Sequence, residues 1–132
     1  MSEPVLLALL FADRIITEDN NKKGIIGTFN RFMAPEFPII FPPWGIYIAL
    51  TNLSGKHSFD LILKNMDNEQ IVLPINGEFE SRNQDEMIEL PLNFTGIAFP
   101  NPGRHILALS IDGDLVGTRM LSVEKIDPPN QA

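Results

Sequence analysis

The sequence predicts an all-β protein, built as a two-sheet antiparallel β-sandwich of about eight strands. Three observations predict this class. Apolar and polar residues alternate with a period of two through most of the chain, helical spacing hardly occurs, and turn-forming residues separate the apolar stretches. The chain has 132 residues, 44% of them hydrophobic, which is the size and composition of a single globular domain. We therefore expect one domain over residues 1–126 and a loose tail over residues 127–132.

The first strand is expected in the run from Val5 to Ala12, which carries no polar residue on either face. Such a run is typical of a strand that is buried on both faces in the middle of a sheet. It is too short to cross a bilayer as a helix, and it lacks the basic residues and the cleavage site of a secretory signal. We therefore expect a cytoplasmic protein.

Period-two alternation predicts further strands in four segments. These segments are residues 44–51, 58–64, 88–94 and 105–111. After Thr95-Gly96 the apolar register moves to Ile97, as a β-bulge at Gly96 would cause.

Turn residues divide the chain at the points where sheet connections are expected. The polar segments 18–24 and 65–69 predict hairpin loops, and Asp112-Gly113 is the strongest short hairpin signal because Gly supplies the positive φ that the turn needs. Asn76-Gly77 is a second signal of this kind. Four prolines between residues 35 and 43 remove ladder donors, so this segment is predicted to cross from one sheet to the other. This spacing of strands and turns is immunoglobulin-like in architecture.

Composition excludes several classes of function. The chain has no cysteine, so it can form no disulfide, thiolate zinc site, iron–sulfur cluster or cysteine nucleophile. Its net charge of −7 argues against binding to nucleic acid or to an anionic membrane, because phosphate contacts need clustered Lys and Arg.

Two regions of the chain hold strings of a familiar kind. They are Ala8-Leu9-Leu10-Phe11-Ala12-Asp13, Asn21-Lys22-Lys23-Gly24-Ile25-Ile26-Gly27-Thr28-Phe29-Asn30-Arg31, Glu36-Phe37-Pro38, and Phe99-Pro100-Asn101-Pro102-Gly103-Arg104-His105-Ile106 with Ile111-Asp112-Gly113. In these strings the chain resembles an uncharacterised bacterial family of short β-sandwich proteins with no assigned function. The strings consist of turn and core residues, so the resemblance implies the fold and no catalytic or binding residue. In related domains a Tyr often follows the Pro-Gly-x turn, where this chain has His105.

The two histidines are the first candidates for chemistry. We expect His105 to be structural, with its ring at the edge of the core and one N–H donated to a backbone carbonyl. His57 has Asp60 three residues later, but side chains alternate along a strand, so these two face opposite sides and cannot form an orienting pair. A Ser-His-Asp site using Ser54 or Ser58 is therefore not expected. We predict no catalytic residue and no cofactor.

A metal site is the next alternative, since Asp112-Gly113-Asp114 is a short acidic turn. Calcium needs six to eight converging oxygens, usually from a dedicated loop motif, and the sequence has no such motif. Turn chemistry already explains the Asp-Gly pair, so no metal ligand is predicted.

Charge is concentrated in residues 66–89, which hold seven acidic residues and the single base Arg82. This segment therefore carries a net charge of −6 of the total of −7. Its charges either protect a sheet edge from aggregation or form an acidic surface for a basic protein partner. The residues of this candidate interaction surface are Asp67, Glu69, Glu78, Glu80, Asp85, Glu86 and Glu89.

Apolar residues are more numerous than the inner faces of two sheets need. Residues 5–12 are apolar on both faces of the expected strand. Ile26 and Phe32 also lie on the face opposite to other apolar residues, and Tyr47 lies on the face opposite to Trp44. A contiguous outer patch would indicate a partner or self-association, unless a loop or the proline-rich crossing covers it. Trp44 itself is expected in the core.

These observations lead to three hypotheses for function. The first is a non-enzymatic protein-interaction or self-associating module, for example a homodimer. The second is a structural component of a larger phage-like or secretion-type assembly. The third, a metal-dependent or hydrolytic enzyme, would need His57 or His105 in a deep pocket beside a carboxylate.

Overall fold

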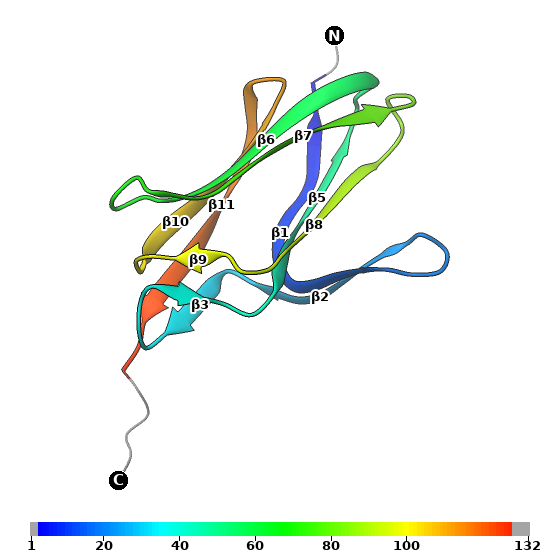
Figure 1. Cartoon of the computed structure of the whole chain (residues 1–132). Helices are drawn as coiled ribbons and strands as arrows, with labels where there is room; N and C mark the ends of the chain where they lie inside the picture. The colour runs from blue at the N-terminus through cyan, green and yellow to red at the C-terminus, as the bar shows by residue number, and fades with distance from the viewer. Residues whose placement is uncertain (1–2, 128–132) are drawn as a thin grey trace.

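The computed structural model describes residues 3–127, and these form eleven strands and no helix (Figure 1). In chain order the strands are β1 (Val5–Thr17), β2 (Lys23–Phe29), β3 (Arg31–Ala34), β4 (Ile39–Ile40), β5 (Trp44–Thr51), β6 (Gly55–Asn65), β7 (Ile71–Ser81), β8 (Ile88–Phe94), β9 (Ala98–Phe99), β10 (Gly103–Ile111) and β11 (Asp114–Lys125). The all-β class predicted from period-two alternation is confirmed. Within residues 3–127 no helix is long and apolar enough to cross a membrane.

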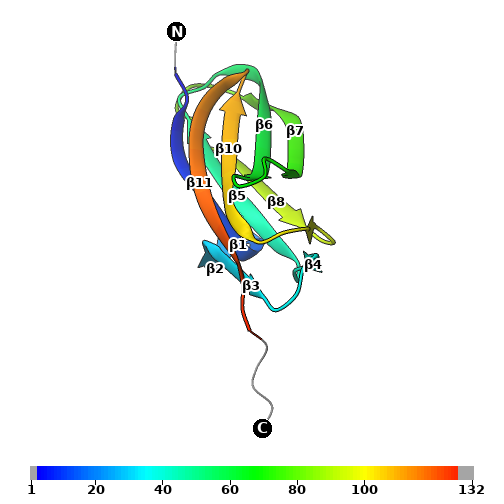
Figure 2. The same ribbon diagram turned by 90° about the vertical axis from the view of Figure 1, so that its left-hand side faces the viewer.

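The strands form two larger sheets and one small one. The four-stranded sheet has the order β2-β1-β5-β8, the five-stranded sheet has the order β3-β11-β10-β6-β7, and β4 pairs with β9. The two larger sheets lie against each other, with the small sheet near one end (Figures 1 and 2). The proline-rich segment leads from β3 in one large sheet to β5 in the other, as the sequence predicted.

One apolar core lies between the two larger sheets, because the inward set of alternating side chains on each strand is apolar. Its fully buried large apolar side chains are Phe11, Ile46, Ile48 and Leu50 from the four-stranded sheet, Leu61, Leu63, Leu107, Leu109, Leu121 and Val123 from the five-stranded sheet, and Phe99 from β9. Trp44 is 2% exposed in this core, as predicted. Its ring packs at 5.0 Å from that of Phe94.

The turns agree with most of the sequence signals. The predicted loops at residues 18–24 and 65–69 connect β1 to β2 and β6 to β7. The Asp112-Gly113 turn connects β10 to β11, and both residues have positive φ, 50° and 88°. Because only glycine adopts such a conformation at no steric cost, Gly113 is the residue that permits this two-residue hairpin.

Several expectations of detail were wrong. The described chain has eleven strands instead of about eight, because the short strands β3, β4 and β9 had no periodicity that could reveal them. The sheets are not wholly antiparallel, since β3 pairs with β11 in parallel. Asn76-Gly77 is no turn but lies inside β7, where the ring of Phe59 packs over Gly77. Gly96 is no bulge, because β8 ends at Phe94 and Gly96 lies in the loop to β9.

The tail predicted for residues 127–132 lies outside the described residues except for Asp127. The last strand, β11, ends at Lys125.

Candidate functional site

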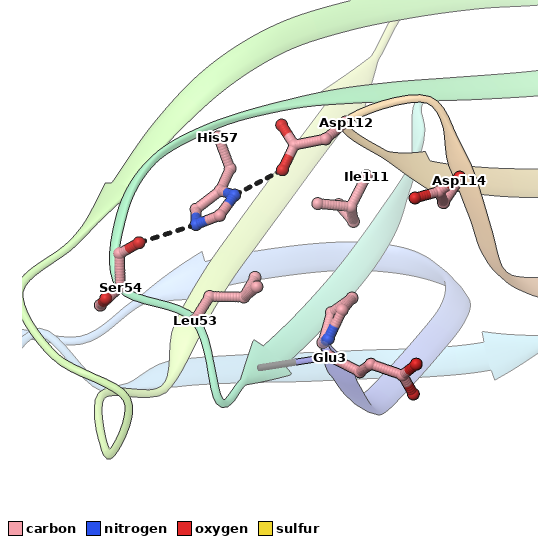
Figure 3. Close-up of a pocket in the computed structure, with 8 residues that line it drawn as sticks. Glu3, Leu53, Ser54, His57, Ile111, Asp112 and Asp114 are labelled. Carbon is pink, nitrogen blue, oxygen red and sulfur yellow. Dashed lines mark hydrogen bonds and ion pairs between the residues drawn. The ribbon is translucent and has the colours of Figure 1, made fainter. Parts of the chain in front are cut away.

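A cleft of about 770 Å³ lies at the end of the molecule where the start of β1 meets the β5–β6 loop and the β10–β11 hairpin (Figure 3). Its lining residues are Glu3, Pro4, Leu53, Ser54, His57, Ile111, Asp112 and Asp114. Leu53 and Ile111 are buried and form an apolar floor, whereas the acidic side chains are exposed. The cleft therefore combines an apolar base with a charged rim.

His57 ties the two loops of this cleft together (Figure 3). Its Nδ1 lies 2.6 Å from Oδ2 of Asp112, and its Nε2 lies 2.9 Å from the backbone oxygen of Ser54. Asp112 also accepts the backbone N–H of Ser58 at 2.9 Å. We call this group, His57 with Asp112 and the Ser54 carbonyl, the histidine clasp.

Both partners of the His57 ring are acceptors, so the two hydrogen bonds form together only when both ring nitrogens carry a proton, that is, in the imidazolium form. The hydrogen bond to Asp112 is the main cause that raises the pKa of His57 above its usual value. The same hydrogen bond is the main cause that lowers the pKa of the Asp112 carboxyl. Geometry and electrostatics therefore agree on a charged pair.

This arrangement is not that of a nucleophilic triad. A catalytic histidine needs one ring nitrogen free to take the proton of the nucleophile, but Nε2 of His57 donates to a carbonyl. Ser54 contributes its backbone oxygen to the ring, and no hydrogen bond of the described residues joins its hydroxyl to His57. Asp60 is exposed on the opposite face of β6, as the alternation predicted.

His105 is fully buried at the start of β10. Its Nδ1 donates to the backbone oxygen of Gly103 at 3.0 Å, and its ring packs against Phe99 at 5.5 Å. Burial is the main cause that lowers the pKa of His105, so the ring is neutral near pH 7. The predicted structural role, a ring at the core with one N–H bonded to a carbonyl, is the role that these contacts describe.

The acidic turn does not gather metal ligands. Asp112 is held by His57 and Ser58, and among residues 3–127 no group of three or more His, Asp or Glu side chains converges on a point that could hold a metal ion.

The seven acidic residues of segment 66–89 lie on β7, on β8 and in the turns on either side of β7. Asp67 and Glu69 lie in the turn before β7, Glu78 and Glu80 lie exposed on β7, and Asp85 lies in the turn after it. Two further members have local partners, since Glu86 pairs with Arg82 at 2.6 Å and Glu89 accepts the hydroxyl of Tyr47. The acids are thus spread along the edge strands β7 and β8, one from each large sheet.

The outer face of the four-stranded sheet carries a second, smaller apolar cluster. Its buried members are Ala12, Ile15, Tyr47 and Ala49, with Ala8 and Ile25 packed against them. Every member comes from β1, β2 or β5, so within the described residues neither a loop nor the proline-rich crossing adds a side chain to this cluster.

The N-terminal apolar run differs from the strand that the sequence predicted. β1 has β5 along one edge, but β2 pairs only with the part from Phe11 to Thr17. The half from Val5 to Leu10 has no strand on its other edge, and Val5 and Leu7 are 46% and 51% exposed. The predicted burial on both faces therefore fails in the first half of the run, because β2 is too short to pair with that half of β1.

β11 repeats this situation in the other sheet. Its pairing with β3 covers only the part from Ser122 to Lys125, so the half from Asp114 to Leu121 is also unpaired on that edge. The two open halves lie side by side (Figure 2). The side chain of Leu6 occupies the space over Gly117, where a Cβ would lie 2.4 Å from Leu6 Cδ2. We call these two adjacent, unpaired strand halves, Val5–Leu10 and Asp114–Leu121, the seam.

Sequence reasoning missed both the histidine clasp and the seam. His57 and Asp112 are 55 positions apart, and nothing in a single sequence pairs the start of β6 with the β10–β11 turn. The seam had a readable signal. The polar loop at residues 18–24 and a following strand of only seven residues limit how far β2 can pair back along β1.

Comparison with solved structures finds low-identity similarity. The β-glucosidase of Listeria innocua has a TM-score of 0.51 at 10% identity, over 96% of this chain and 17% of that chain. The Pseudomonas fluorescens alkylpurine DNA glycosylase AlkC, bound to DNA containing an abasic site analog, has a TM-score of 0.41 at 8% identity, over 88% of this chain and 30% of that chain. This chain spans only about a sixth of the β-glucosidase, and at this identity the similarity shows the fold alone.

No curated protein matches the sequence. A sequence profile matches residues 7–124, which is most of the chain and includes all strands from β2 to β10. The chain therefore belongs to a family of unknown function (DUF6941).

Proposed function

We propose that the chain is a non-enzymatic protein-interaction module that contacts its partner through the seam. The observation that carries this proposal is the pair of unpaired strand halves with exposed apolar side chains. Val5 and Leu7 on β1 and Leu115 on β11 are 46%, 51% and 65% exposed. An open strand edge with apolar side chains can accept another chain, which is why proteins usually protect such edges.

Two of the other sheet edges, β7 and β8, carry residues that disfavour pairing with another strand. β7 has Pro74, Glu78 and Glu80, and β8 has Glu89 and Pro91. Proline removes a ladder donor and charge disfavours pairing with a second strand. The open half of β1, from Val5 to Leu10, contains neither a charged residue nor a proline. This difference between β1 and the edge strands β7 and β8 supports the seam as the surface that contacts a partner.

The state of His57 supports a module without hydrolytic chemistry, because its two ring nitrogens are both engaged in the histidine clasp. We further propose an immunoglobulin-like sandwich architecture, supported by the two large sheets around one core. The lack of cysteine is compatible with the cytoplasmic location that the sequence predicts.

Site-specific photo-crosslinking in cells tests the proposal. The photoreactive residue p-benzoylphenylalanine replaces Leu7 on the seam, and in a matched control it replaces Met33, which is 50% exposed on β3. We expect a discrete protein adduct from position 7 and none from position 33. Equal yields of adduct at both positions, or none at position 7, would contradict the proposed surface.

A further inference from the structure

The seam is acidic at one end and basic at the other. At the end next to the cleft lie Glu3 and Asp114, both exposed. The backbone of Glu3 is held there, since its carbonyl oxygen accepts Nδ2 of Asn52 at 2.8 Å. At the other end Arg119 lines a hollow of about 240 Å³ together with Leu10, Phe11, Thr28, Phe29 and Asn30.

The two ends are separated by the open half of β1. Leu10 follows Glu3 by seven positions, so the rise of a strand places the two ends about 23 Å apart. Between them lie only apolar side chains on the β1 side of the seam. Arg119 is exposed, and none of the hydrogen bonds or ion pairs described for residues 3–127 involves it.

We propose that the occupant of the seam is a second copy of this chain, related by a two-fold axis near the middle of the seam. This inference rests on the proposed function and names its partner. In such a dimer the strands run antiparallel, so the acidic end of one copy meets the basic end of the other. Asp114 and Glu3 of each copy then face Arg119 of its partner, and the apolar centres containing Leu7 meet.

The charge pattern favours this arrangement over the alternatives. A parallel copy would place acid against acid and base against base, at a cost in free energy. Each copy carries a net charge of −7, so two copies repel each other unless charges at the contact are complementary. The two-fold arrangement supplies two complementary contacts at once, because every contact of an isologous interface occurs twice.

The hollow at Arg119 gives the incoming carboxylate a place to bind. The guanidinium offers several N–H donors, and Thr28 and Asn30, which line the same hollow, have side chains that can donate hydrogen bonds. Phe29 and Leu10 form its apolar wall. A carboxylate from Asp114 or Glu3 of the second copy suits this set of donors.

Light scattering after size exclusion, from low micromolar to submillimolar concentration, tests the proposal with charge reversals. We expect the native chain to form a dimer, and we expect Arg119→Glu and Asp114→Arg each to raise the dimer dissociation constant about tenfold or more, because each variant creates two like-charge contacts. Arg104→Glu is the matched control, since Arg104 is exposed on β10, opposite Ser122 and outside the seam, and the charge change is the same.

Mixing the two reversed variants gives the sharper result. The Arg119→Glu chain has acid at both ends of its seam, and the Asp114→Arg chain has a base at both ends, next to Glu3 at the end beside the cleft. We therefore expect a heterodimer in the equimolar mixture. Circular dichroism confirms that each variant is folded. A native chain that stays monomeric, a mixture that stays monomeric, or an equal effect of Arg104→Glu would overturn the proposed dimer. A photo-adduct from position 7 to a different protein would overturn the proposed dimer but would leave the proposed function intact.

Discussion

Asp112→Asn isolates the charge of the histidine clasp. The asparagine side chain keeps an oxygen that can accept the N–H of Ser58, and asparagine tolerates the positive φ of 50° at this position. It removes only the negative charge that faces His57. We therefore expect the fold to persist and the pKa of His57 to fall back toward its ordinary value.

The magnitude follows from the exposure of the pair. The side chains of His57 and Asp112 are 18% and 48% exposed, so solvent screens their attraction and the pair contributes about 0.5–1 kcal/mol. For a chain of this length the entropy of unfolding converts that free energy to a change in Tm of about 2–4 °C.

The pH dependence has a definite sign. The raised pKa of His57 means that its contribution is fully present below the unfolded pKa near 6.5 and is lost as pH rises through the folded value. The lowered pKa of Asp112 means that its contribution is present above about pH 4 and is lost as pH falls through the folded value. The histidine clasp therefore stabilises the protein most between about pH 4 and 6.5.

The assay compares the Tm of the native chain and of Asp112→Asn at about pH 5.5 and pH 8.5. We expect a difference of about 2–4 °C at the lower pH and a smaller one at the higher pH. His105 is buried with a lowered pKa in both proteins, so its opposite effect on stability at low pH cancels in the difference. The reasoning fails if NMR titration gives His57 the same pKa in both proteins, or if the Tm difference does not depend on pH.

Three further substitutions test the core and the outer face. His105→Ala should lower the free energy of unfolding by about 2–4 kcal/mol in denaturant, because it leaves a cavity beside Phe99; a loss below about 1 kcal/mol would contradict a packed role. Burial is the larger cause, and Glu89 the second, that raises the pKa of Tyr47 to about 12. Glu89→Gln should therefore lower the midpoint of the absorbance titration of Tyr47, the single tyrosine of the chain. An unchanged midpoint would refute the contact between Tyr47 and Glu89. Gly45→Ala places a Cβ 2.8 Å from a β8 carbonyl and should cost about 1–3 kcal/mol by thermal or chemical unfolding, whereas a neutral effect would show that the two strands separate freely.

The sequence was sufficient for the fold class because period-two alternation is a local signal. The rows Leu61 with Leu63 and Leu107 with Leu109 identify their strands and also their buried face. The turn at Asp112-Gly113 was equally local, since positive φ restricts the residue types at that point.

Strand order was not accessible in this way. The pairing of β3 with β11 joins residues about ninety positions apart, and β3 has only four residues, too few to show a period. Asn76-Gly77 has the composition of a turn, but pairing with β6 and the Phe59 ring over Gly77 keep the chain extended. In that case tertiary packing outweighed local preference.

The candidate site depended on the same long-range information. The histidines were identified as the residues to examine, but the partner of His57 comes from a hairpin that the sequence does not place beside it. The seam follows from a mismatch between the length of β1 and that of its neighbour, which composition alone conceals.

Hydrogen exchange tests the central claim, that the seam is a contact surface, most directly. Deuterium uptake is compared between dilute and concentrated protein for residues 5–10 and 114–121, with β7 (Ile71–Ser81) as the charged edge that should stay free. We predict that uptake in both halves of the seam falls as concentration rises and that uptake in β7 does not change. Unchanged uptake in the seam, or protection that develops in β7 instead, would contradict this account.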